Sequence, residues 1–233
     1  MKILTMKFGG TSVGDVDRIK TVRDIISDEV KNGWNVVAVV SAMSNETNKL
    51  INLAKQVGVE SLVDPEYDSL ISTGEDISSS LLSIALNSIG ISSRSWRGWQ
   101  LPVRTDSFHS NAKIEEIKTE KLVETFKGGT KVAVVSGFQG IEKSGRITTL
   151  GRGGSDTSAV AIAAATDAKR CDIYTDVSGI FTTDPRIKKN ASKLKKISFE
   201  EMLEMASLGA NVLQTRAVEL AMRHKVPITV LNS

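Results

Sequence analysis

The sequence predicts an α/β fold, a three-layer αβα sandwich in which a mainly parallel central sheet lies between two layers of helices. Short apolar runs such as 36–40 and 132–135 alternate with longer segments whose apolar residues recur at helical spacing. Apolar runs without polar alternation are typical of strands covered on both faces, as in parallel sheets. The glycine-rich polar clusters follow predicted strands, and sheets of this kind bind ligands at those strand ends.

Length and composition are those of an ordinary globular protein. The chain has 233 residues, of which 40% are hydrophobic and 24% charged, and its formal net charge of +3 is too small to indicate a nucleic-acid partner. No apolar stretch reaches the roughly 18 residues that a membrane span needs, and the first residues do not resemble a signal peptide. The single cysteine, Cys171, fits a reducing compartment, so we expect a cytoplasmic protein with neither membrane nor nucleic-acid partners.

In the first half of the chain, predicted strands and helices alternate. Helix 15–31 is predicted because apolar residues recur along it at helical spacing. Segment 72–75 is expected to precede a helix, and segment 98–113 shows no clear period, so we expect irregular structure there. The predicted strands are 2–8, 36–40 and 91–96, and the predicted helices are 15–31, 45–57 and 77–88.

The second half repeats this alternation. Ser198 and Glu201 form the pattern of a capping box at the start of a helix, and Gly209 is expected to end that helix. The helix after the central glycines is apolar nearly all round, which predicts that it is buried. The predicted helices are 119–127, 157–168, 199–208 and 212–224, the strands are 132–135, 171–175 and 228–231, and the segments 138–140 and 146–149 form a hairpin.

The glycine-dense turn Gly151-Arg152-Gly153-Gly154-Ser155-Asp156 stands at the centre of the functional prediction. Its glycines allow positive φ and a close approach of backbone to a ligand, and Ser155 and Asp156 are expected to cap the following helix. A helix start offers unpaired N–H groups to an anion, and the Arg152 guanidinium matches a carboxylate or a phosphate with two parallel hydrogen bonds. The alternative is a tight loop that lets a buried helix pack.

Two further clusters suit a nucleotide. Segment 7–12, Lys-Phe-Gly-Gly-Thr-Ser, places a cation and bare backbone at a strand end, although a strand that ends in Gly-Gly is common. Segment 175–176 with segment 184–186 could hold a sugar and phosphates, or could be an ordinary Asx turn. The chain has neither a P-loop nor a Gly-x-Gly-x-x-Gly motif after a strand. His109 and His224 have no His or Cys partner at ligand spacing, so we predict no metal site held by either.

Taken together, the motifs of the chain resemble the signature of the aspartate kinases, a branch of the amino acid kinase family. The motifs are Lys7-Phe8-Gly9-Gly10-Thr11-Ser12, Thr73-Gly74-Glu75, Gly137-Phe138-Gln139-Gly140, Leu150-Gly151-Arg152-Gly153-Gly154-Ser155-Asp156 and Tyr174-Thr175-Asp176-Val177. They occur in the family's order and at its spacings. The resemblance runs from Met1 to Ser233 and implies one amino acid kinase catalytic domain with the amino acid kinase fold.

The resemblance implies transfer of the γ-phosphoryl group of ATP to the side-chain carboxylate of L-aspartate. The product, 4-phospho-L-aspartate, leads to lysine, threonine, methionine and diaminopimelate. Because the acceptor carboxylate has a pKa of about 3.9 and is already ionised at neutral pH, no general base is needed. Catalysis then depends on alignment and on neutralising the charge of the phosphoryl oxygens.

By the same resemblance, individual residues are assigned to the two substrates. Lys7 contacts the transferring phosphate and Asp156 holds that lysine in place, Arg152 grips a carboxylate of aspartate, and Glu75 pairs with its ammonium group. The expected ATP site is Lys7, Phe8, Gly9, Gly10, Thr175, Asp176, Phe181, Arg186, Asn211 and Val212, and the expected aspartate site is Ser41, Thr47, Glu75, Arg152 and Ser155. Mg²⁺ is implied as a cofactor, bound mainly by phosphate oxygens and without a dedicated set of protein ligands.

The chain departs from the family's pattern at three places. Phe181 stands where the family usually has Tyr, and Asn211 stands where it usually has a second phosphate-binding Lys, which predicts a slow enzyme. Aspartate kinases usually continue into a pair of regulatory ACT domains, which we expect to be absent from this chain, since it stops at Ser233. The resemblance leaves a homo-oligomer open.

Two other functions stay open at this point. Another amino acid kinase, acting on glutamate, acetylglutamate or a nucleoside monophosphate, would share the phosphate loops, but the turn around Arg152 and segment 73–75 match the aspartate branch. A domain that binds aspartate or a nucleotide without turnover is the second alternative, and Asn211 is its best support.

Overall fold

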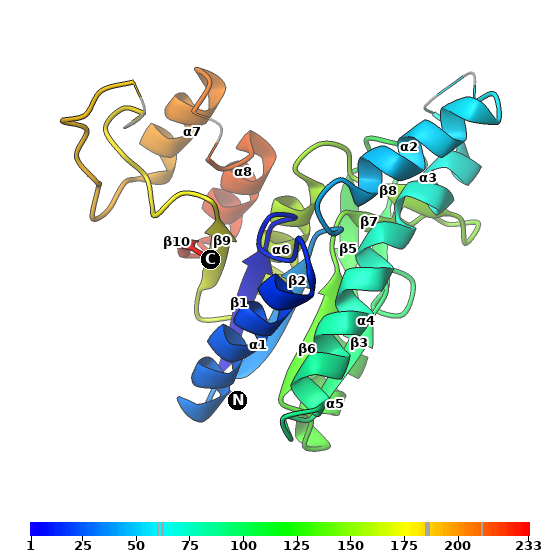
Figure 1. Cartoon of the computed structure of the whole chain (residues 1–233), viewed down its shortest axis with the longest axis horizontal. Helices are drawn as coiled ribbons and strands as arrows, with labels where there is room; N and C mark the ends of the chain where they lie inside the picture. Colours follow the sequence, from blue (N-terminus) through cyan, green and yellow to red (C-terminus); the bar gives the residue numbers. More distant parts are fainter. Residues whose placement is uncertain (60, 62, 185–186, 211) are drawn as a thin grey trace.

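The computed structural model describes residues 1–59, 61, 63–184, 187–210 and 212–233, and its centre is a six-stranded sheet in the order β10-β9-β1-β2-β6-β3 (Figure 1). All neighbouring strands of this sheet pair in parallel. Its strands are β1 (Ile3–Phe8), β2 (Asn35–Val40), β3 (Ser93–Trp96), β6 (Val132–Ser136), β9 (Cys171–Thr175) and β10 (Ile228–Asn232). The predicted parallel sheet is therefore confirmed.

Helices cover both faces of the sheet, which confirms the three-layer sandwich. They are α1 (Val16–Lys31), α2 (Glu46–Gln56), α3 (Pro65–Ile71), α4 (Thr73–Asn87), α5 (Glu120–Lys127), α6 (Gly154–Ala165), α7 (Phe199–Ser207) and α8 (Thr215–His224). Among the described residues, none of these helices combines the length and the apolar character that crossing a membrane requires.

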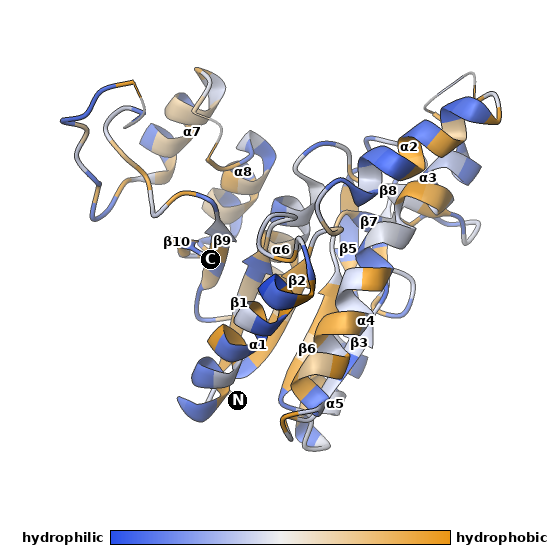
Figure 2. Cartoon of the chain, viewed as in Figure 1, coloured by the Kyte–Doolittle hydropathy of each residue, from blue (hydrophilic) through white to orange (hydrophobic). Residues whose placement is uncertain are grey.

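Two separate hydrophobic cores explain why the central strands lack polar alternation. Val36, Ala38 and Val40 of β2 pack toward α1 and α4, whereas Val37 and Val39 point to the other face. That second face is covered by α5, α6, α7 and α8. Since successive side chains of a strand point to opposite faces, a strand between two cores is apolar at every position, as the colouring of β2 and β6 in Figure 2 shows.

A second, four-stranded sheet in the order β5-β4-β7-β8 lies beside α3. Its strands are β4 (Val103–Thr105), β5 (Ile114–Ile117), β7 (Gln139–Ile141) and β8 (Ile147–Thr149). β7 and β8 form the predicted hairpin, and β4 lies within the segment for which irregular structure was expected. β5 and α3 were not predicted, because segments of four and seven residues are too short to show a clear period.

The predicted start of α6 was wrong. Ser155 and Asp156 do not cap this helix: Gly153 occupies the cap position in the left-handed conformation, with φ of 71°, and α6 begins at Gly154. Glycine takes that conformation at little cost, so the helix begins earlier than expected. As a result, Ser155 and Asp156 lie in the first turn of the helix.

Other boundaries also differ from the prediction. Thr73, Gly74 and Glu75 do not precede α4 but form its first turn, because α4 begins at Thr73 directly after the short helix α3. The helix predicted over 212–224 begins only at Thr215. The capping box of Ser198 and Glu201 at the start of α7 is confirmed.

Candidate active site

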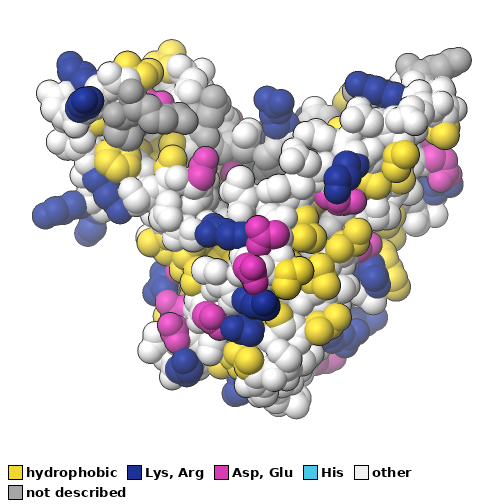
Figure 3. Space-filling model, viewed as in Figure 1, with side chains coloured by type: hydrophobic (Ala, Val, Ile, Leu, Met, Phe, Trp, Pro, Cys, Tyr) yellow, Lys and Arg dark blue, Asp and Glu magenta, His cyan; other side chains and the backbone are white. Residues whose placement is uncertain are grey.

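The carboxyl ends of the parallel strands form the floor of a cleft of about 790 Å³. Register brings these ends together, since Phe8 of β1 pairs with Val40 of β2 and with Tyr174 of β9. Figure 3 shows the surface hollowed between the part of the molecule that carries α7 and the part that carries α2. The residues predicted for the site that line this cleft are Lys7, Gly9, Gly10, Ser41, Thr47, Glu75, Arg152, Ser155, Asp156, Thr175, Asp176 and Val212.

Lys7 and Asp156 form an ion pair at the floor of the cleft. Lys7 lies near the end of β1 and Asp156 in the first turn of α6, and the lysine Nζ is 2.7 Å from a carboxylate oxygen. The two side chains are only 12% and 10% exposed, so water screens the pair far less than it screens a surface ion pair. Because an ammonium group has three donors, Asp156 can orient Lys7 while N–H groups remain for an anion in the cleft.

Glu75 is a buried carboxyl group that also lines the cleft. One carboxylate oxygen accepts a hydrogen bond from the backbone N–H of Ala42 at 3.0 Å, while the other is buried without a hydrogen-bond partner among the described residues. Burial raises the pKa of Glu75 to about 8, and the hydrogen bond from Ala42 offsets only part of that effect. A buried carboxyl group with an unsatisfied oxygen in a cleft is suited to a cationic ligand.

The start of α4, and with it Glu75, is held by Asp76. One oxygen of Asp76 accepts hydrogen bonds from Ser136 at 2.9 Å and from the side-chain amide of Gln139 at 3.2 Å. The other oxygen forms an ion pair with Arg97 at 3.1 Å. Gln139, from the motif of residues 137–140, therefore ties the first turn of α4 to β7 and does not line the cleft itself.

Small residues allow three segments to meet at the back of the cleft. A Cβ atom on Gly10 would lie 3.0 Å from the carbonyl oxygen of Ala42, and one on Gly74 would lie 2.8 Å from the Ala42 side chain. The loop after β1, the loop after β2 and the first turn of α4 therefore meet around Ala42. This packing sets the distance between Glu75 and the loop that carries Gly9 and Gly10.

A second cavity of about 630 Å³ adjoins the first, and the two share Thr175, Asp176 and Val212. Its wall includes the apolar side chains of Ile180 and Phe181. Thr175 donates a hydrogen bond from its hydroxyl to the Asp176 carboxylate at 3.1 Å. An apolar wall beside a polar edge is suited to a flat, partly apolar ligand that carries polar groups at one end.

Comparison with known proteins places the chain in a family. Residues 2–232 match the amino acid kinase family. The chain belongs to the amino acid kinase family. It is 52% identical over 233 residues to an aspartokinase of Bacillus sp. (strain MGA3), covering 100% of this chain and 56% of that protein.

Solved structures agree with this assignment. The crystal structure of aspartate kinase from Synechocystis matches with a TM-score of 0.86 and 46% identity, over 99% of this chain and 37% of that one. E. coli aspartokinase III in complex with aspartate and ADP matches with a TM-score of 0.87 and 28% identity, over 99% of this chain and 62% of that one. The chain thus spans about half the length of the curated relatives it matches.

Not every residue expected in the kinase site faces the cleft. Phe8 is fully buried in the core, where its ring stacks on Tyr174 with centroids 4.8 Å apart. The backbone N–H of Gly9 donates to the Tyr174 carbonyl at 3.3 Å, which leaves it a less available phosphate donor than expected. Phe181 lines the second cavity. Arg186 and Asn211 lie outside the described residues.

Sequence reasoning missed several residues that line the cleft of this amino acid kinase. Asn45, Asn48 and Gln214 bring side-chain amides to it, and Phe138 brings a ring. Asn45 has a positive φ of 63°, and an Asn directly before a helix is a signal that could have drawn attention to it. Gln214 directly follows the apolar residues Val212 and Leu213, and nothing in this stretch of sequence indicates a role in the cleft.

Proposed function

We propose that this member of the amino acid kinase family transfers the γ-phosphoryl group of ATP to the side-chain carboxylate of L-aspartate. The observation that carries the proposal is that Arg152 and the buried Glu75 line the same cleft, because together they complement the carboxylate and the ammonium group of an amino acid. The second cavity, which shares Thr175 and Asp176 with the cleft, gives the nucleotide a place beside the acceptor.

The geometry supports a mechanism of alignment and charge neutralisation. Lys7, oriented by Asp156, contacts the oxygens of the transferring phosphoryl group and offsets the charge that spreads over them. The backbone N–H of Gly10, which has no hydrogen-bond partner among the described residues, is a second donor. Since the acceptor carboxylate is ionised at neutral pH, no residue needs to remove a proton from it.

Glu75 has to be ionised to pair with the ammonium group of the amino acid. Its raised pKa means that the empty cleft favours the neutral acid at pH 7, and a bound cation favours the carboxylate. Aspartate binding is therefore coupled to loss of one proton from Glu75. Affinity for aspartate rises with pH until Glu75 is ionised in the free protein as well.

Magnesium fits the donors at the junction of the two cavities. Mg²⁺ prefers oxygen ligands and in kinases is held by one or two carboxylates together with substrate phosphates. Asp176 borders both cavities and would supply such a carboxylate. The described residues contain no cluster of three or more His, Cys, Asp or Glu side chains that could hold a metal ion by themselves. When bound, the ion would neutralise charge on the phosphate oxygens.

One assay tests this proposal. Release of ADP is measured with ATP and Mg²⁺ and, in parallel, with L-aspartate, L-glutamate, N-acetylglutamate or UMP as the acceptor, and the acyl phosphate is trapped with hydroxylamine. We expect ADP release and hydroxamate with L-aspartate only, and both slowed by on the order of 10²-fold or more in Lys7→Ala. Turnover with another acceptor would replace aspartate in the proposal. Calorimetric binding of aspartate and ATP without any turnover would instead indicate a binding domain.

A further inference from the structure

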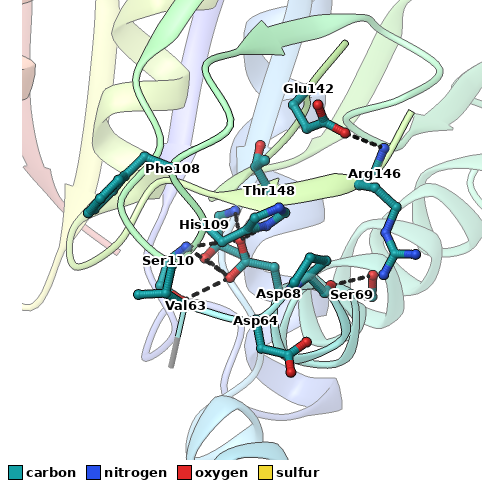
Figure 4. Close-up of polar contacts among 12 residues, drawn as sticks. Val63, Asp64, Asp68, Ser69, Phe108, His109, Ser110, Glu142, Arg146 and Thr148 are labelled. Carbon is teal, nitrogen blue, oxygen red and sulfur yellow. Dashed lines mark hydrogen bonds and ion pairs between the residues drawn. The ribbon is translucent and has the colours of Figure 1, made fainter. Parts of the chain in front are cut away.

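Asp68 of α3 is a fully buried carboxylate that does not line the cleft. It accepts hydrogen bonds from the backbone N–H of Thr149 at 2.8 Å and from the Thr149 hydroxyl at 2.7 Å. It also accepts from the backbone N–H of Ser110 at 2.9 Å and from the Ser110 hydroxyl at 3.1 Å, and His109 Nδ1 lies 3.0 Å away. Figure 4 shows the Asp68 side chain directed at His109 and Ser110.

The number of these contacts has a physical consequence. A carboxylate without water is tolerated only when hydrogen bonds replace its hydration, and hydrogen bonds to an ionised group are the stronger ones. The donors on Asp68 come from two segments that are far from it in the sequence, by 41 residues for His109 and by 81 for Thr149. Asp68 therefore holds the loop of residues 109–111 and the end of β8 together.

A cation holds the same two segments from the other side. Arg216 of α8 donates to the Leu150 carbonyl at 2.6 Å and to the Arg152 carbonyl at 3.3 Å. Its other terminal nitrogen donates to the Asn111 side chain at 3.0 Å. Asp68 thus accepts hydrogen bonds from the backbone N–H groups of residues 110 and 149. Arg216 donates to oxygens of the next residue in each segment, the side chain of Asn111 and the carbonyl of Leu150.

Gly151 lies where these two sets of contacts meet. Its φ is +72°, and a Cβ atom there would lie 2.9 Å from the Ser110 carbonyl oxygen and 3.0 Å from the Asn111 side-chain oxygen. The turn that carries Arg152 is thus packed directly on the loop of residues 109–111. Any shift of that loop moves the backbone of Arg152.

We infer that Asp68 and Arg216 are positioning residues that fix the Arg152 turn, and through it the grip on the carboxylate of the amino-acid substrate. Neither residue is among the described residues that line the cleft, so both act through the backbone of residues 149–152. The inference rests on the proposed function. Displacement of a substrate-binding group by about 1 Å can cost on the order of 10²-fold in rate, so a loosened turn has a measurable effect.

The first test is Asp68→Asn, which keeps the size of the side chain but turns an amide donor toward groups that are themselves donors. We expect the KM for L-aspartate to rise at least about tenfold, the worth of roughly one charge-assisted hydrogen bond, while the KM for ATP stays within about twofold. Asp64→Asn is the matched control. Asp64 caps the same helix, and Asn caps equally well, so both KM values are expected to stay unchanged.

The second test needs no substrate. Hydrogen–deuterium exchange, read by mass spectrometry, is expected to become faster at residues 149–154 in Asp68→Asn, and to stay as in the parent in β9 and in the Asp64→Asn control. Arg216→Lys keeps the charge but loses the two terminal nitrogens that donate to Asn111 and Leu150. We expect it to raise the KM for aspartate and to speed exchange at residues 149–154, each to a smaller extent than Asp68→Asn. It also serves as the test if Asp68→Asn does not fold.

The outcomes separate the two proposals. If the parent protein releases no ADP with aspartate, the proposed function fails, and exchange at residues 149–154 still decides whether the two residues fix the turn. If the parent is active and both variants keep the KM for aspartate within about twofold of the parent, the inference is overturned. A parallel rise of both KM values, or faster exchange throughout the sheet, would also overturn it, because that pattern indicates a general loss of stability.

Discussion

Around Arg152 the cleft depends on contacts between distant parts of the chain, whereas around Phe181 its wall is held by neighbours in the sequence. The Arg152 turn is bound by Arg216, 66 residues away from Leu150, and by Asp68, 81 residues away from Thr149. By contrast, residues 180–182 bond to residues 192–194 of the same segment, with a hydrogen bond across only 10 residues between Thr182 and Ser192. The side proposed for the amino acid, around Arg152, is therefore held by distant parts of the fold. On the side proposed for the nucleotide, around Phe181, segment 180–194 is held by hydrogen bonds within itself.

This difference suggests that the two sides use different means of recognition. The amino-acid side presents a few charged groups whose positions have to be held, so it draws on the whole fold. The nucleotide side presents apolar area, which tolerates small shifts because burial of apolar surface does not depend on direction. Variants on the two sides should accordingly differ in which KM they change.

The largest effect is expected where the two sides meet. Lys7→Ala removes the cation proposed to contact the phosphoryl group, and loss of one such electrostatic contact typically costs on the order of 10²–10³ in kcat. It also leaves Asp156 buried without its partner, so the melting temperature should fall as well. Steady-state kinetics and thermal unfolding measure the two effects. A kcat within a factor of about three of the parent would remove Lys7 from the mechanism.

Arg152→Ala should separate the two sides. Loss of a pair of parallel hydrogen bonds to a carboxylate is expected to raise the KM for aspartate by about 10² while the KM for ATP changes little. Initial rates with each substrate varied in turn give both constants. An unchanged KM for aspartate would exclude Arg152 from the amino-acid site.

Asn211→Lys tests the second lysine of the family's pattern. Position 211 lies outside the described residues, so the expectation comes from the resemblance to the aspartate kinases. A cation should stabilise the charged transition state better than an amide, and we expect kcat to rise at least about tenfold with little change in the KM for aspartate. A lysine variant that binds ATP but is no faster than the parent would show that this position does not serve the transition state.

Phe181→Ala should affect the nucleotide side alone. Truncation of this partly buried ring removes part of the apolar wall, and we expect the KM for ATP to rise about three- to tenfold while the KM for aspartate stays constant. Phe181→Tyr, which restores the family's usual residue, is the control and should bind ATP at least as well as the parent. A change in the KM for aspartate instead would contradict the separation of the two sides.

Glu75 should set the pH dependence of stability, a quantity separate from the kinetic constants of the other variants. Its pKa is about 8 in the folded protein against an ordinary value of 4.5, so the folded state binds more protons than the unfolded state between these values. The free energy of unfolding therefore falls as pH rises from about 4.5 to about 8. In Glu75→Gln this loss is absent, so its melting temperature should gain on that of the parent by on the order of ten degrees from pH 5 to pH 8. If the melting temperatures of the parent and of Glu75→Gln change with pH in the same way, the pKa of Glu75 lies near its ordinary value and this prediction is wrong.

The strands of the central sheet and the long helices that cover it could be predicted from the sequence, because each has a local hydrophobic pattern. The apolar run of β2 and the spacing of α1 are visible without any knowledge of tertiary contacts. The start of α6 was wrong because Gly153, in the left-handed conformation, took the cap position from Ser155 and Asp156. Short elements such as α3 and β5 depend on tertiary contacts that no local period predicts: α3 packs on β8, and β5 pairs with β4.

The same limit applies to the site. Lys7, Glu75 and Arg152 were found because they stand in motifs that resemble those of a known family. Asp68 was missed, since nothing in its own neighbourhood marks it and its partners lie 41 and 81 residues further along the chain. Asp156, which holds Lys7, was found because it stands in such a motif, whereas Asp68 stands in none.

Ala42 has a consequence for any attempt to change the acceptor. Its N–H binds Glu75, its side chain faces Gly74, and its carbonyl faces Gly10, so one small residue separates three functional segments. Enlarging any of the three positions alone would push a neighbour away from the cleft. A redesign for a longer dicarboxylic amino acid has to alter residues 10, 42 and 74 together, and a library that varies them one at a time would recover inactive proteins.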